Sequence, residues 1–219
     1  FCSRFQEAEF LSLIAAGSGA AAGGYPIYGN AASFGFRKSV FLEMEDAMNE
    51  KIISGDDTFF IHNAKKAGRK IRILKSKQAI VVTRHQESWS RYFNQRIRWV
   101  SKSRHYRDLN TIITAVWVML MNALLLFTLA LLFRKGNPGF FVVFFALKTF
   151  TDYYFLAYFL RFFGKHMPVL RFVIFSFMYP FMVIIWTIWG ITGSYEWKGR
   201  KFQGDCSIAH LRHKHNAHN

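Results

Sequence analysis

The chain has 219 residues, of which 52% are hydrophobic and 18% aromatic, and its formal net charge is +16. This aromatic content argues against an ordinary soluble domain, and two cysteines at opposite ends, Cys2 and Cys206, exclude a disulfide framework and a cysteine-rich metal motif. Lys and Arg gather near the ends of hydrophobic segments, which favours a membrane surface over nucleic acid as the partner of the basic residues. Since the first residue is Phe, we expect the C-terminal part of a longer protein.

Residues 1–85 predict an α/β region. Apolar positions at helical spacing are followed by short runs rich in β-branched residues. The expected elements are a helix over Ser3–Ala16 that ends at the glycine-rich run Gly17–Gly24, extended pieces within Tyr25–Lys38, helices over Ser39–Met44 and Thr58–Gly68, and strands at Lys70–Leu74 and Ala79–Thr83. This order is typical of an α/β domain.

A glycine-containing bend lies within the stretch Tyr25–Lys38. Gly29, next to Asn30, allows the backbone to approach another group closely. That group is either a ligand or a neighbouring strand, and the residues alone leave both interpretations open.

Two adjacent carboxylates, Asp56 and Asp57, follow Ser54 and Gly55 at the predicted start of a helix. In one interpretation, one carboxylate caps the helix and the other interacts favourably with its dipole. In the other, one of them faces a cleft and takes a proton from an attacking hydroxyl.

The stretch Gln86–Arg104 predicts an amphipathic helix. Its polar stripe is formed by Arg91, Gln95, Arg98 and Lys102, and its apolar side by Trp89, Phe93, Ile97 and Val100. We expect the apolar side to rest on lipid or protein core while the polar stripe faces an anion.

Three hydrophobic segments, 111–133, 140–163 and 168–191, are each about a membrane thickness long. Lys148 and Asp152 make the second segment marginal, but their i, i+4 spacing allows an ion pair facing the bundle; a polar path for substrate is the alternative. Pro180 predicts a kink in the third segment.

The remaining residues, 194–219, form a basic tail. Its histidines, His210, His213, His215 and His218, either bind a transition metal weakly or belong to a solvated segment. Three spans would place this tail outside, whereas Lys198, Arg200 and Lys201 favour the inside. We expect three spans, with the front half in the cytoplasm.

Taken together, Asn30 with Phe36-Arg37, then Gly55-Asp56-Asp57, then Gln95-Arg96-Ile97-Arg98-Trp99 before a hydrophobic span resemble the C-terminal half of membrane-bound family 2 glycosyltransferases. These QxxRW enzymes include cellulose, chitin and hyaluronan synthases and ceramide glucosyltransferase. The resemblance implies part of a GT-A nucleotide-sugar transferase domain (1–85), an interfacial helix (86–110), an α-helical transmembrane region (111–193) and the tail (194–219). It also implies inverting sugar transfer to a glycan or lipid acceptor at an inner or plasma membrane.

The same resemblance assigns roles to individual residues. Asp57 aligns with the general base and Asp56 with the acidic residue before it. Gln95, Arg96 and Arg98 would contact the pyrophosphate of the nucleotide-sugar donor. The acceptor side would be formed by Trp99, Gly29 and Asn30.

The family's metal site has no counterpart in this sequence, because no DxD motif precedes Gly55. The resemblance implies that Mg²⁺ or Mn²⁺ is bound in the full-length enzyme by ligands outside this chain, and we expect these residues alone to be inactive. A non-catalytic membrane module, such as a transporter subunit or an anionic-lipid-binding scaffold, is the alternative function.

Overall fold

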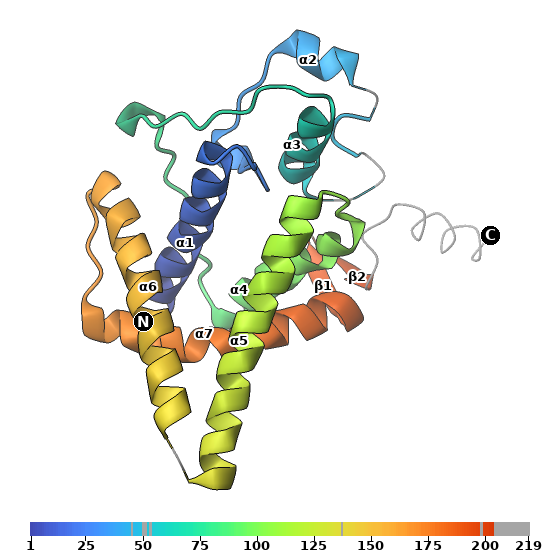
Figure 1. The fold of residues 1–219 in the computed structure, drawn as a ribbon. Coiled ribbons are helices and arrows are strands. Elements are labelled where there is room, and N and C mark those ends of the chain that lie inside the picture. The colour runs from blue at the N-terminus through green and yellow to red at the C-terminus, as the bar shows by residue number, and fades with distance from the viewer. Residues whose placement is uncertain (45, 50–51, 53, 137, 198, 204–219) are drawn as a thin grey trace, which may run out of the picture. The chain divides into compact units, whose positions relative to one another are not determined.

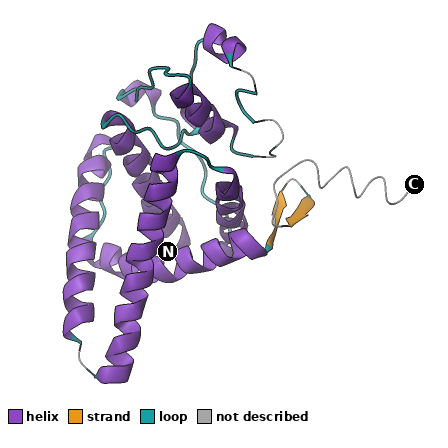
Figure 2. Cartoon of the chain, turned by 45° about the vertical axis from the view of Figure 1, so that its right-hand side comes forward, coloured by secondary structure: helices purple, strands orange, loops and turns teal. Residues whose placement is uncertain are grey.

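A computed structural model describes residues 1–44, 46–49, 52, 54–136, 138–197 and 199–203. Among these residues, helices make up most of the regular structure, and strands are confined to one hairpin (Figure 2). The chain divides into two compact units. One unit contains Phe1–Ala15 and Ile113–Ile185, and the other contains Ala16–Ile112 and the residues from Trp186 onward.

The first unit is built mainly from α5 (Leu109–Lys135), α6 (Gly139–Phe162) and α7 (Val169–Thr192). Each of these helices is long and apolar enough to cross a membrane. α5 and α6 run in opposite directions (Figure 1). The three hydrophobic segments predicted from the sequence are therefore confirmed as helices.

Helix α1 (Cys2–Ala22) contributes its N-terminal part to this first unit. The ring of Phe5 meets that of Phe175 of α7 edge to face, with centroids 5.2 Å apart, and the carboxylate of Glu7 pairs with the ammonium of Lys165. These contacts place the start of α1 against a candidate membrane span, although its sequence alone gave no such indication.

The ionisable pair of α6 also lies in the first unit. The ammonium of Lys148 is 2.6 Å from Oδ2 of Asp152, so the ion pair allowed by the i, i+4 spacing forms. The side chain of Lys148 is largely covered, whereas that of Asp152 is about half exposed. A pair held within one helix lowers the cost of placing both charges in an apolar segment.

The second unit contains the shorter elements. These are the 3₁₀ turns η1 (Ala31–Ser33), η2 (Lys77–Ala79) and η3 (Lys102–His105), the helices α2 (Lys38–Glu43), α3 (Asp56–Lys66) and α4 (Trp89–Ser101), and the antiparallel strands β1 (Ser194–Trp197) and β2 (Arg200–Gln203). Its core is centred on Ala47, Phe60 and Ala64. Phe34, next to η1, and Val40 and Phe41 of α2 pack against this core. In the hairpin, Tyr195 pairs with Phe202 and both are buried.

The α/β GT-A fold expected for residues 1–85 is wrong. Among the described residues the only sheet is the hairpin of β1 and β2, and the predicted strands at Lys70–Leu74 and Ala79–Thr83 are extended segments outside any sheet. Leu74 and Val82 are exposed there. Strand propensity largely reflects packing between neighbouring strands, so β-rich residues without a pairing partner remain loops.

The end predicted for α1 is also wrong, because the helix continues through Gly17 to Ala22. A Cβ atom at Gly17 would lie 2.7 Å from Cζ of Tyr28, so the tyrosine ring packs directly on the helix backbone at this glycine. Tertiary packing of this kind outweighs the weak helix propensity of glycine. The tail histidines and Cys206 lie outside the described residues, as does Lys198.

Candidate functional site

The first turn of α3 carries both predicted catalytic carboxylates. Gly55 precedes it in the left-handed conformation, with φ of 100°, which a residue with a side chain rarely adopts. Asp56 and Asp57 occupy the positive end of the helix dipole, while Lys65 and Lys66 occupy the negative end. Charges at both ends therefore stabilise the helix, and Asp56 is exposed at its start.

Asp57 joins the start of α3 to the glycine-containing bend. Its Oδ2 accepts a hydrogen bond from the backbone N–H of Ala31 at 2.9 Å, and its Oδ1 accepts one from the N–H of Thr58 at 2.7 Å. Asn30 caps η1 by accepting from Ala32. A Cβ atom at Gly29 would lie 3.3 Å from the carbonyl oxygen of Asp57. The structure thus brings together Asp57, Gly29 and Asn30, which the sequence predicted to serve one site.

The apolar side of α4 packs on the end of α7 within the second unit. Rings of Tyr92 and Phe93 contact Trp186, with centroids 5.6 and 6.0 Å away. A Cβ atom at Gly190 would lie 2.6 Å from Cγ1 of Val100, so the two helices approach closely at this glycine. Part of the predicted apolar side therefore rests on protein.

Arg96 lies on the buried side of α4. Only 4% of its surface is exposed, and its guanidinium carbon is 4.1 Å from the ring centroid of Trp99 and 4.9 Å from that of Tyr92. Cation–π contacts of this geometry stabilise a buried guanidinium. Of the residues assigned to the donor and the acceptor, Arg96 and Trp99 are thus in contact with each other.

Arg98 brings the end of α4 to the start of α3. Its Nη1 donates a hydrogen bond of 2.9 Å to Oγ of Ser54, a residue 44 positions earlier in the chain. Ser54 is buried and lies three residues before Asp57. Arg98, the arginine of the QxxRW run, is therefore bonded to the short loop that leads into Asp57, the predicted base. Gln95, half-buried on the same helix, lies one turn before Trp99.

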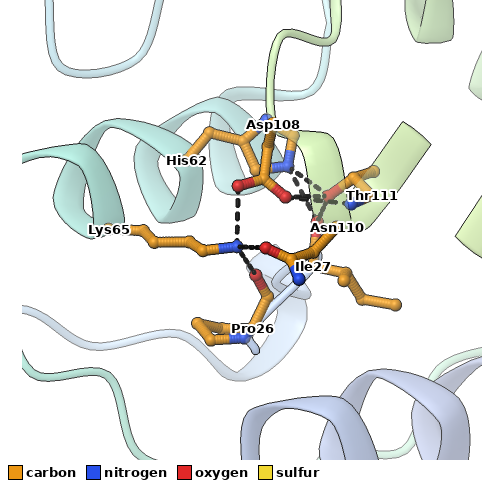
Figure 3. Close-up of polar contacts among 7 residues, drawn as sticks. All are labelled: Pro26, Ile27, His62, Lys65, Asp108, Asn110 and Thr111. Atoms are coloured by element: carbon orange, nitrogen blue, oxygen red, sulfur yellow. Dashed lines mark hydrogen bonds and ion pairs between the residues drawn. The ribbon is translucent and has the colours of Figure 1, made fainter. Parts of the chain in front are cut away.

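A second polar cluster lies at the other end of α3 (Figure 3). The ammonium of Lys65 is 2.7 Å from Oδ2 of Asp108 and 2.7 Å from Oδ1 of Asn110. Nε2 of His62 is 2.8 Å from the carbonyl oxygen of Ile27 and 3.0 Å from the hydroxyl of Thr111. Since a carbonyl oxygen only accepts, Nε2 carries the hydrogen.

Asp108 also caps the first candidate membrane helix. Its Oδ1 accepts hydrogen bonds of 2.9 Å from both the backbone N–H and the hydroxyl of Thr111 in the first turn of α5. This is the geometry of an N-cap carboxylate. The cluster therefore fixes the entry to α5 against α3 and against the segment at Ile27.

Two groups in this cluster have shifted pKa values. Burial lowers the pKa of His62 from its usual 6.5, and this outweighs the opposite effects of the Ile27 carbonyl and Asp108. Burial acts to raise the pKa of Asp108, but the hydrogen bonds from Lys65 and Thr111 outweigh it and lower the pKa below 3.8. At neutral pH the cluster therefore holds a neutral imidazole beside a Lys–Asp ion pair.

This cluster was not predicted from the sequence. One local signal was available, because an aspartate immediately before a hydrophobic helical run is a candidate N-cap. Nothing local connects Asp108 to His62 or Lys65, which precede it by more than forty residues.

No group of three or more His, Cys, Asp or Glu side chains is placed to hold a metal ion within the described part of the chain. The resemblance places the ligands of its divalent cation outside this chain, so that cation stays a prediction.

Comparison with known proteins gives one match. The model of glycosyl transferase family 21 matches residues 47–207, which include α3, α4, the three candidate spans and the hairpin. No curated protein and no solved structure matches the chain. The match supports a glycosyltransferase, but it does not support the assignment to family 2. Because it covers well over half of the sequence, the chain belongs to glycosyl transferase family 21.

Proposed function

We propose that this chain carries the base and the diphosphate-contacting arginine of an inverting glycosyltransferase that uses a nucleotide-sugar donor and a membrane-presented acceptor. The observation that carries the proposal is the hydrogen bond from Arg98 to Ser54. It holds a guanidinium at the loop that leads into Asp57. Inverting transfer requires both groups, one for the departing phosphate oxygen and one for the attacking hydroxyl.

The chemistry is a single displacement. The carboxylate of Asp57 takes the proton of an acceptor hydroxyl while the hydroxyl oxygen forms a bond to the anomeric carbon of the sugar. The bond from that carbon to the donor phosphate breaks, and the nucleoside diphosphate leaves with the electron pair. Hydrogen bonds to Asp57 from Ala31 and Thr58 fix the orientation of the carboxylate. Arg98 contributes positive charge for the leaving diphosphate.

The remaining predicted residues surround this pair. We assign Asp56 to the electrostatic environment of the base, and Gln95 to the donor side together with Arg98. Trp99 offers an aromatic face for the acceptor. Arg96 lies buried against Trp99, so we assign it to holding that ring, with an indirect effect on the donor. Gly29 and Asn30 shape the acceptor side through their contacts with α3 and η1.

The acceptor is proposed to be a lipid hydroxyl at the cytoplasmic face of an inner or plasma membrane. Support comes from α4, which packs on Gly190 in the last turns of a helix able to cross a membrane. A nascent glycan chain is the competing acceptor. A divalent cation bound by ligands outside these residues stays a prediction of the sequence resemblance.

The test uses the full-length protein in its native membranes. Radiolabelled nucleotide-sugars are supplied one at a time, and label is followed into lipid extracts and into insoluble glycan. Asp57→Asn is expected to lower transfer by about 10²- to 10⁴-fold. Glu43→Gln, which removes an exposed carboxylate of the same unit, serves as the matched control.

Two results would contradict the proposal. Unchanged sugar transfer by Asp57→Asn would show that Asp57 is not the general base. Absence of transfer from every nucleotide-sugar, with binding to anionic vesicles retained, would favour the non-catalytic membrane module instead. Label in glycan rather than in lipid would identify a glycan as the acceptor, and the proposed role of Asp57 would stand.

A further inference from the structure

The end of α7 lies beside the residues that precede α5. The guanidinium of Arg104 donates to the carbonyl oxygen of Ile191, and the side chain of Val100 packs on Gly190. These four residues belong to the second unit, as does Leu109, the first residue of α5. The beginning of the first candidate span and the end of the third are therefore close in space.

This proximity limits how many of the candidate spans cross a membrane. Arg104 and Leu109 are five positions apart, which is at most about 18 Å of fully extended chain. The path is shorter than this, because Arg104 lies in the 3₁₀ turn η3. Even with the arginine side chain added, the separation stays below the roughly 30 Å thickness of a hydrocarbon core. Three crossings would place these two helix ends on opposite faces of the membrane, so three crossings do not fit the structure.

The course of α7 identifies the helix that does not cross. Within the first unit, α5 and α6 form a hairpin whose two helices run in opposite directions, whereas residues 169–185 of α7 run across both of them (Figure 1, Figure 2). A bilayer that α5 and α6 traverse along their lengths is therefore not traversed by α7.

The surface of α7 is divided into a covered side and an exposed apolar side. Exposed hydrophobic residues recur at intervals of three, four and seven positions and so lie along one side: Leu170, Ile174, Phe177, Phe181 and Ile188. The opposite side is buried at Phe172, Phe175, Trp186 and Gly190. A helix that is apolar all round needs apolar surroundings on both sides. Protein covers one side of α7, and the acyl chains of a lipid leaflet can cover the other.

We propose that α5 and α6 cross the membrane as a hairpin, whereas α7 lies along the leaflet on the side of α3 and α4 without crossing it. Its exposed apolar side contacts the acyl chains of that leaflet. The β1–β2 hairpin, which follows α7 and contacts α4, is then on the same side as the proposed active site. Arg200 and Lys201 therefore lie where the positive-inside rule favours them, which three spans do not achieve. This arrangement is independent of the chemistry proposed for Asp57.

The experiment labels single cysteines in the full-length protein, from which all other cysteines have been removed. Sealed membrane vesicles of known orientation are treated with a membrane-impermeant maleimide before and after they are opened with detergent. The four positions are exposed and report on α3, the end of α5, the α6–α7 connection and β1: Lys66→Cys, Arg134→Cys, His166→Cys and Glu196→Cys. We expect Arg134→Cys to be labelled from one face of the membrane and the other three from the opposite face.

Three labelling patterns would overturn the proposal. Labelling of Glu196→Cys from the same face as Arg134→Cys would put the end of α7 on the wrong side. Labelling of His166→Cys from the face of Arg134→Cys would mean that α6 does not cross. Labelling of all four positions from one face would mean that the α5–α6 hairpin does not cross.

The depth of α7 gives a second, independent measurement. Spin labels at Leu170→Cys, Phe181→Cys and Ile188→Cys are compared in phosphatidylcholine proteoliposomes by their accessibility to oxygen and to a water-soluble nickel chelate. Since a helix rises 1.5 Å per residue, a crossing α7 would place position 181 about 10 Å deeper than position 188. In the proposed arrangement all three labels have similar depths, because they share one side of a helix parallel to the membrane plane. A label at position 181 that is about 10 Å deeper than both others would overturn the proposal.

Discussion

The two ends of α3 carry polar clusters of opposite character. At its C-terminal end, Lys65 is bonded to Asp108 and Asn110, and His62 to Ile27 and Thr111, so the groups satisfy one another. At its N-terminal end, Asp56 is exposed, Asp57 accepts from the backbone N–H groups of Ala31 and Thr58, and Arg98 donates to Ser54. The first arrangement stabilises a fold by itself. The second leaves a carboxylate exposed to solvent, as expected for the proposed active site.

The largest expected effect comes from comparing two aspartate variants, each measured for both activity and thermal stability. Asp57→Asn is expected to lower kcat by about 10²-fold or more while the thermal unfolding midpoint in detergent changes little, because an amide oxygen still accepts from Thr58. Asp108→Asn is expected to do the reverse. A large loss of stability in Asp57→Asn, with unchanged activity per folded molecule, would show that Asp57 has a structural role, as Asp108 has.

Loss of the lysine in the structural cluster gives the next largest effect. Lys65→Met is expected to lower the free energy of unfolding by about 2–3 kcal/mol, because Asp108 and Asn110 lose a charged donor. Chemical denaturation followed by tryptophan fluorescence measures it. Lys66→Met, one position further along the same helix and exposed, is the control. Equal stability of the two variants would show that the cluster contributes nothing.

The contact between α4 and α7 gives an intermediate effect. Gly190→Val places a side chain where Val100 already lies, and overpacking of this kind costs about 1–3 kcal/mol. We expect lower thermal stability together with lower sugar transfer, since α4 carries Arg98. Val100→Ala in the same protein should relieve part of both losses. No relief would mean that the helices do not meet at this point.

The smallest expected effect is the pH dependence due to His62. Its pKa in the folded protein is below 6.5, so below that pH the unfolded chain binds a proton that the folded chain resists. Stability therefore falls as the pH decreases from 6.5 toward the folded pKa, and is fully present above 6.5. Asp108 and Lys65 face this ring, and Asp108 loses its own contribution only at more acidic pH. His62→Gln should remove the slope near pH 6, and an unchanged slope would assign it to another group.

Sequence reasoning succeeded where the signal is local and long. The apolar runs after Thr111 specify α5, α6 and α7, because length and hydropathy suffice for a helix that crosses a membrane. The helix predicted over Thr58–Gly68 is present as α3, with Asp56 and Asp57 in its first turn as the capping pattern indicates.

It failed where a distant partner decides the structure. Residues 70–74 and 79–83 have strand propensity but no strand beside them. Arg96 is charged and was expected to face a ligand, yet two aromatic rings of its own helix cover it. At the candidate site the types of residue were predictable, and so was the amphipathic helix. The bond between Arg98 and Ser54, 44 residues apart, was not.

The guanidinium of Arg104 donates to the carbonyl oxygen of Ile191, 87 residues later in the chain, at the end of α7. Together with Val100 on Gly190, this contact means that α4 cannot reach its final position until α7 has been synthesised. At ribosomal rates of roughly 5–20 residues per second, that interval is about 4–17 s. During biogenesis α4, which carries the proposed diphosphate-contacting residue Arg98, therefore packs only after the candidate membrane helices have been synthesised.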